Sequence, residues 1–96
     1  MKLKDVIKGL EILSATADME QEITGVSYDS RTTAPGDVFV AISGEAVDGH
    51  RFIPMAAEKG AACVVCEYVP EGDIPYVQVA SSRKALALMA GNWFDH

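Results

Sequence analysis

The chain contains 96 residues, a length that fits one domain with one modest hydrophobic core. Hydrophobic residues make up 49% and charged residues 23% of the sequence, values that exclude a disordered or fibrous chain. The net charge of −6 has the wrong sign for binding a nucleic-acid backbone, and no apolar run is long enough to cross a membrane. The N-terminus also lacks the apolar core of a signal peptide, so we expect a soluble, cytoplasmic protein.

The first third of the sequence predicts one helix and one strand. Apolar residues recur at the spacing of an amphipathic helix near the N-terminus, at Leu3, Val6, Ile7 and Leu10. We expect this helix to end around residues 10–13. The run 23–28 then alternates apolar with small or polar residues, which predicts a half-buried strand.

The middle of the sequence predicts a strand, helix, strand unit. Pro35 and Gly36 occupy the centre of a predicted type II turn, because proline fixes φ and glycine accepts a positive φ. The apolar run 38–42 is typical of an interior strand covered on both faces. Further elements are expected in chain order: a loop over 43–50 with a cap at Asp48 or His50, a helix with Pro54 in its first turn, strands over 62–66 and 75–80, and a last helix capped by Ser81 or Ser82. The fold class is therefore α/β, with a βαβ unit in one domain over residues 1–96.

The last helix ends on large apolar residues. Its apolar positions have helical spacing, at Leu86, Met89, Ala90, Trp93 and Phe94. Neither glycine nor proline follows to stop the helix, so we interpret the chain as a fragment of a longer protein. The alternative is a native terminus whose aromatic side chains fold back onto the core.

Cys63 and Cys66 have the spacing of a redox or half-zinc motif, but they fall in a predicted buried strand. Positions three apart on a strand point to opposite faces, so we interpret both as core thiols. His50 and His96 have no spacing that would complete a zinc site, and no metal site is expected.

The sequence contains no complete catalytic set, and its chemistry-bearing residues lie in two loops that follow predicted strands. The loops span 28–31 and 43–50, and ligands of α/β proteins bind at this edge of the sheet. Ser30 could donate to an oxyanion, with Arg31 supplying positive charge or pairing with Asp29. The spacing by itself favours the other interpretation, a structural Asx turn in which Asp29 and Ser30 satisfy backbone groups at the strand end. For His50, capping or loop packing is favoured over a role as general base. We interpret Glu67, Glu71 and Asp73 as solvated turn positions.

Several runs of the sequence together resemble the N-terminal domain of the Mur ligases, which build the peptide stem of peptidoglycan. The matching runs cover residues 23–31, 35–41, 44–50, 56–61 and 82–87. Within the family, residues 29–31, 47–50 and 85–90 are most similar to the UDP-N-acetylmuramoyl-tripeptide synthetase (MurE) type. The related type that adds D-Ala-D-Ala shares part of this pattern and stays an alternative, as does a free-standing nucleotide-binding or interaction module.

The resemblance implies a Rossmann-like domain with a small mixed sheet and flanking helices, which holds the uridine diphosphate end of UDP-MurNAc-L-Ala-D-Glu. It implies that Tyr28 and Ser30 lie beside the nucleotide, that Glu45, Ala46 and Val47 form a second contact loop, and that Asp29, Arg31, Gly44 and His50 support the site. It assigns ATP, magnesium and amide-bond formation to central and C-terminal domains that this chain lacks. We therefore expect no cofactor and no ligase activity in this chain alone.

Overall fold

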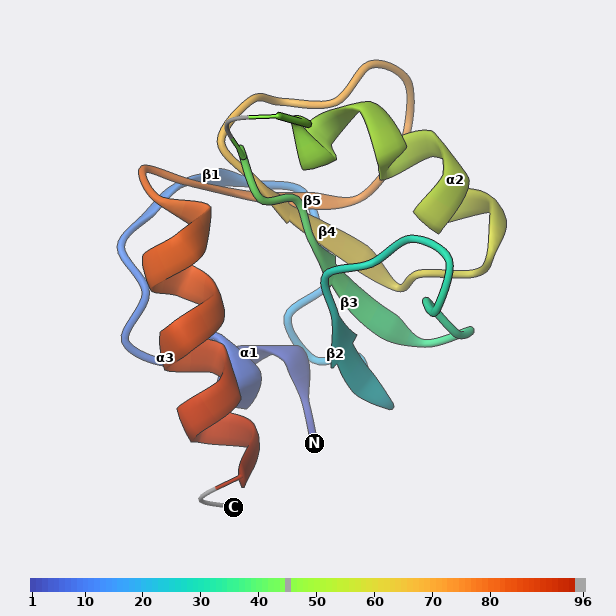
Figure 1. The fold of residues 1–96 in the computed structure, drawn as a ribbon. Helices are drawn as coiled ribbons and strands as arrows, with labels where there is room; N and C mark the ends of the chain where they lie inside the picture. Colours follow the sequence, from blue (N-terminus) through green and yellow to red (C-terminus); the bar gives the residue numbers. More distant parts are fainter. Residues whose placement is uncertain (45, 95–96) are drawn as a thin grey trace.

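The computed structural model describes residues 1–44 and 46–94 and shows a five-stranded sheet between layers of helices (Figure 1). The strands are β1 (Ile12–Ala15), β2 (Gly25–Ser27), β3 (Asp37–Val40), β4 (Cys63–Cys66) and β5 (Tyr76–Val79). They lie in the order β1-β5-β4-β3-β2, with β2 to β5 parallel and β1 antiparallel to β5. This mixed sheet confirms the expected α/β class.

The helices cover both faces of the sheet. They are α1 (Leu3–Val6), the 3₁₀ turn η1 (Gly49–Phe52), α2 (Ile53–Glu58) and α3 (Ser82–Phe94). Figure 1 shows α1 and α3 together on one face and α2 on the opposite face. The segment β3-α2-β4 forms the predicted βαβ unit.

Each interior strand contributes alternately to two hydrophobic cores. On β3, Val38 and Val40 face the core beneath α1 and α3, whereas Phe39 faces the core beneath α2. On β4, Cys63 belongs to the first core and Cys66 to the second. Both thiols are free and buried, which confirms the interpretation that the pair lies on opposite faces and fills the two cores.

The predicted extent of the first helix was wrong. Its apolar residues do pack into the core, but α1 ends at Val6, and Gly9 has a φ of +94° that a continuing helix does not allow. Residues 12–15, which we expected at or beyond the helix end, form β1 and pair with β5. This edge strand is mostly exposed, so its sequence lacks the alternation that marks a half-buried strand.

The turn before β3 has the predicted geometry. Gly36 has a φ of +88°, and the backbone N–H of Asp37 donates to the Ala34 carbonyl at 3.1 Å. Beyond it, α2 has Pro54 in its first turn, as expected, and β4 and β5 lie within the predicted runs 62–66 and 75–80. The turn leads directly into β3. It thereby fixes one end of the loop over residues 28–36, which joins β2 to β3.

The end of α3 places its two aromatic residues differently. Trp93 is partly buried and packs against the core beneath α1 and α3, whereas 82% of Phe94 is exposed. His96 lies outside the described residues. Within the described ranges, no helix has the length and hydropathy needed to cross a membrane.

Candidate functional site

A cleft opens where β2 and β3 end. Parallel strands present their carboxyl ends at one edge of a sheet, so the loops after β2 and β3 meet there. The cleft has a volume of about 490 Å³, within the usual range of small-molecule sites. It is lined by Tyr28, Asp29, Ser30, Arg31, Ile42, Val47, Gly49, Phe52 and Met55.

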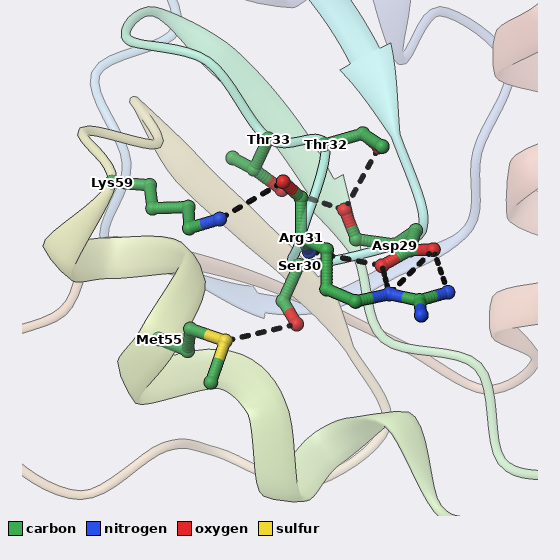
Figure 2. Close-up of polar contacts among 7 residues, drawn as sticks. All are labelled: Asp29, Ser30, Arg31, Thr32, Thr33, Met55 and Lys59. Atoms are coloured by element: carbon green, nitrogen blue, oxygen red, sulfur yellow. Dashed lines mark hydrogen bonds and ion pairs between the residues drawn. The ribbon is translucent and has the colours of Figure 1, made fainter.

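Asp29 organises the first loop (Figure 2). Its carboxylate accepts the backbone N–H of Arg31 at 2.9 Å, the Asx turn that the sequence predicted. The same carboxylate accepts from the Arg31 guanidinium at distances of 2.8 to 3.3 Å. The hydroxyls of Thr32 and Thr33 both donate to the Asp29 carbonyl at 3.1 Å. The loop is therefore built around one aspartate.

This pairing also sets the electrostatics of the loop. The guanidinium and the backbone N–H of Arg31 lower the pKa of Asp29 to about 2, so the carboxylate stays charged at neutral pH. The two side chains neutralise each other, yet the Arg31 side chain is 83% exposed. Since a guanidinium has five N–H donors, Arg31 keeps donors for an anion while it is paired.

Ser30 lies at the inner wall of the cleft. The residue is only 5% exposed, and its hydroxyl donates to the Sδ atom of Met55 at 3.4 Å. A thioether is a weak acceptor, so this hydroxyl can change partners at little cost. The Asx turn at Asp29 is present, and the Ser30 hydroxyl is directed toward Met55 in the cleft wall (Figure 2).

The second loop is a tight turn whose polar backbone is largely used internally. The N–H of Gly44 donates to the Val47 carbonyl at 3.0 Å, and the N–H of Gly49 donates to the Ile42 carbonyl at 2.7 Å. These two N–H groups are therefore already bonded within the chain and are not open to a phosphate. Val47 is 48% exposed and lines the cleft through its side chain.

Two other predicted residues of this loop, Gly44 and Ala46, are exposed, and neither lines the cleft. Glu45 lies outside the described residues. Of the two described residues of the predicted second contact loop, Ala46 and Val47, Val47 lines the cleft.

His50 connects the loop after β3 to the residue that follows β4. Its Nδ1 lies 2.7 Å from Asp48 Oδ1, and its Nε2 accepts the backbone N–H of Glu67 at 2.8 Å. With both ring nitrogens engaged and a side chain only 9% exposed, it is not placed to act as a general base. Asp48 also accepts the His50 backbone N–H, the predicted cap, and these bonds lower its pKa.

Glu67 was misjudged from the sequence. It is partly buried, and its carboxylate accepts the backbone N–H of Ser82 at 2.9 Å, at the first turn of α3. A carboxylate at a helix N-terminus satisfies an open donor and complements the helix dipole. Ser81 completes this cap by accepting the N–H of Lys84. Glu71 and Asp73 are exposed, as expected.

The sequence did not predict that α2 and the preceding η1 turn form a wall of the cleft. Phe52 and Met55 line the cleft, and the ammonium of Lys59 donates to the Arg31 carbonyl at 2.9 Å. Met55 and Lys59 are four residues apart, which puts them on one side of a helix. That spacing was available in the sequence, but the loop that they contact was not identifiable without the fold.

Further clefts are present among the described residues, and two of them compare with this one. One, of about 260 Å³, lies between His50, Pro54, Tyr68 and Pro70. The other, of about 480 Å³, is mostly apolar and runs along β2 and the end of α3, with Trp93 and Phe94 in its wall. Neither has a buried hydroxyl group beside an exposed guanidinium. That combination is found in the cleft at the ends of β2 and β3, which we call the Ser30 cleft.

Comparison with known families shows to which family the chain belongs. The model of the family described as "Mur ligase family, catalytic domain" matches residues 22–93, and the chain belongs to this family. Three curated relatives are named UDP-N-acetylmuramoyl-L-alanyl-D-glutamate--2,6-diaminopimelate ligase. They come from Phocaeicola vulgatus (39% identity, 98% of this chain), Clostridium tetani (42%, 100%) and Bradyrhizobium diazoefficiens (43%, 98%). The chain spans about a fifth of the length of these relatives.

Solved structures show the same fold. MurF from Acinetobacter baumannii superposes with a TM-score of 0.72 over 94% of this chain and 19% of its own, at 26% identity. MurF from Thermotoga maritima, solved in complex with ADP, gives a TM-score of 0.62 over 68% of this chain and 15% of its own, at 35% identity. The resemblance drawn from the sequence is thereby confirmed at the level of the family and of the domain fold.

Proposed function

We propose that this chain is the domain of a peptidoglycan-precursor ligase that holds the uridine diphosphate end of UDP-MurNAc-L-Ala-D-Glu. The observation that carries the proposal is the Ser30 cleft, in which a buried hydroxyl rests on a thioether beside an exposed guanidinium. The names of the relatives support it, since their substrate is a uridine nucleotide.

The cleft offers separate surfaces for the parts of a nucleotide. Its apolar and aromatic wall, formed by Ile42, Val47 and Phe52, suits the uracil ring. We assign the diphosphate to the Ser30 hydroxyl and the outer face of Arg31. A net charge of −6 does not oppose this assignment decisively, because local donors set the potential inside a cleft.

In the complete ligase, this domain positions the substrate. Anchoring the nucleotide lets remote binding energy hold the reacting D-Glu carboxylate in place for attack by an amine. Among residues 1–44 and 46–94, no group of three His, Cys, Asp or Glu side chains converges. We assign ATP and magnesium, which would activate the carboxylate, to the rest of the longer chain, and we expect this domain alone to be inactive. We place the complete enzyme in the cytoplasm, because that is where a ligase finds ATP.

The related D-Ala-D-Ala-adding type is the second candidate, because the MurF structures superpose well. Identity favours the first type: the three diaminopimelate ligases share 39 to 43% of aligned residues, against 26% for MurF from A. baumannii and 35% for MurF from T. maritima. Since these relatives are named for 2,6-diaminopimelate, we propose that amino acid as the one added by the complete enzyme.

A titration of the ¹⁵N-labelled chain with UDP tests the binding proposal. We expect amide shifts at residues 28–31 and 44–49, with smaller shifts when pyrophosphate replaces UDP, since pyrophosphate lacks the base. Shifts confined to residues outside these loops would refute the assignment of the cleft.

A further inference from the structure

The Ser30 loop is fastened from the side by α2. Met55 and Lys59, one helical turn apart, contact consecutive residues of the loop (Figure 2). The Met55 sulfur accepts the hydroxyl of Ser30 at 3.4 Å, and the Lys59 ammonium donates to the Arg31 carbonyl at 2.9 Å. These contacts join the two walls of the cleft.

The loop has a second set of anchors on the strand side. The Thr33 hydroxyl is buried, lies 3.0 Å from the Ser27 hydroxyl at the end of β2, and donates to the Asp29 carbonyl. These bonds fix where the loop leaves the sheet but not how far its tip lies from α2. The far end of the loop is held near the end of α2 by the Gly36 N–H, which donates to the Gly60 carbonyl at 2.9 Å, and the bond from Lys59 adds a tether at the tip, beside Ser30.

The two contacts differ in strength. A bond from an ammonium group to a carbonyl is charge-assisted, whereas a thioether accepts weakly. Lys59 therefore holds the backbone next to Ser30, while Met55 holds the Ser30 hydroxyl in a bond that a phosphate oxygen readily replaces.

We propose that Lys59 is a positioning residue of the nucleotide cleft and that Met55 keeps the Ser30 hydroxyl in an exchangeable bond until an oxygen of a uridine diphosphate displaces the sulfur. This inference rests on the proposed function. It adds two α2-side residues to the site and assigns each a separate effect on affinity.

The Lys59 half is tested by measuring the UDP dissociation constant of three variants of the 96-residue chain by amide NMR. Lys59→Met removes the donor and should weaken UDP binding about three- to tenfold. Lys59→Arg keeps a charged donor and should bind within about twofold of wild type. Lys84→Met removes the same charge from α3, outside the cleft, and should also stay within about twofold. The urea midpoint should be the same in all of them, because Lys59 is exposed.

The proposed exchange of the Ser30 hydroxyl from Met55 to the nucleotide is tested by a double-mutant cycle of Met55 and Ser30. Met55→Leu keeps the apolar volume but offers no acceptor, so the hydroxyl gives up no bond when UDP binds. We expect UDP binding about two- to threefold tighter than wild type, and no such gain when Met55→Leu is combined with Ser30→Ala.

The outcomes separate this inference from the proposed function. If wild type shows no response to UDP, the proposed function fails. If wild type responds but Lys59→Met matches it, if Lys59→Arg is as weak as Lys59→Met, or if Lys84→Met weakens binding equally, Lys59 has no positioning role. A Met55→Leu chain that binds like wild type, or keeps its gain without Ser30, overturns the exchange.

Discussion

Ser30 is the residue on which the proposed site depends most directly. Its hydroxyl is bonded to sulfur, a weak partner, so Ser30→Ala should change the free energy of unfolding by less than about 1 kcal/mol. A hydrogen bond to a charged phosphate is stronger, and its loss should weaken UDP binding about tenfold. Urea unfolding and a UDP titration measure the two effects separately.

A matched serine elsewhere controls this experiment. Ser14 lies on β1, away from the cleft, and its hydroxyl donates to the Gln78 side chain at 2.8 Å. Ser14→Ala should leave UDP binding unchanged. Equal UDP affinities in wild type and Ser30→Ala would remove the hydroxyl from the site.

The low pKa of Asp29 determines how the stability of the loop depends on pH. Its pKa is about 2 in the folded chain, against an ordinary value of 3.8, because Arg31 donates to its charged form. Its contribution to stability is therefore complete above about pH 4 and is lost as the pH falls through 2. Carboxyl ¹³C shifts should show a midpoint near 2, and Arg31→Gln should move the pKa upward. A wild-type midpoint near 3.8 would mean that the pair does not form in solution.

At the scale of elements, two glycines should respond to alanine in opposite directions. At Gly36, with φ of +88°, an added Cβ would lie 2.8 Å from Thr24 Oγ1, so Gly36→Ala should cost about 1–3 kcal/mol. At Gly91, on α3, an added Cβ meets nothing within 4 Å, so Gly91→Ala should add about 0.5–1 kcal/mol. Urea unfolding of both variants checks the pair. Similar stabilities would contradict the turn geometry and the helix together.

The strand β4 makes a prediction about thiol chemistry. Burial raises the pKa of Cys63 to about 12 and that of Cys66 to about 11, so both thiols are protonated at neutral pH. A disulfide reagent should label them about a thousandfold faster in urea than in native buffer, because the native thiols react through rare unfolding. Formation of a disulfide between them in the native chain would contradict their placement in separate cores.

Elements with a strong local pattern could be predicted from the sequence. The apolar run of β3, the turn at Gly36 and the apolar stripe of α3 each determine their structure locally, and all were found near the expected residues. β1 could not be predicted in this way, because an exposed edge strand is defined by its pairing with β5. The role of Glu67 was also missed, since the N–H group that it caps lies 15 residues away.

For the molecule as a whole, the topology brings the predicted residues together. Tyr28 and Ser30 lie in one predicted loop and Val47 in another, and all three line one cleft because β2 and β3 are parallel neighbours. The internal bonding of Gly44 and the wall formed by Met55 could not be predicted, because both depend on how loops pack against each other. The charge of −6 has the wrong sign for a nucleic-acid backbone, and under the proposed function a diphosphate would depend on a few local donors.

A crystal structure of the chain with UDP tests the central claim most directly. We predict that the nucleotide lies between Tyr28 and Val47, with a diphosphate or ribose oxygen within hydrogen-bonding distance of Ser30 Oγ and the Met55 sulfur displaced from it. A nucleotide bound instead in the cleft formed by His50, Tyr68 and Pro70, with the bond between Ser30 and Met55 unchanged, would contradict the assignment.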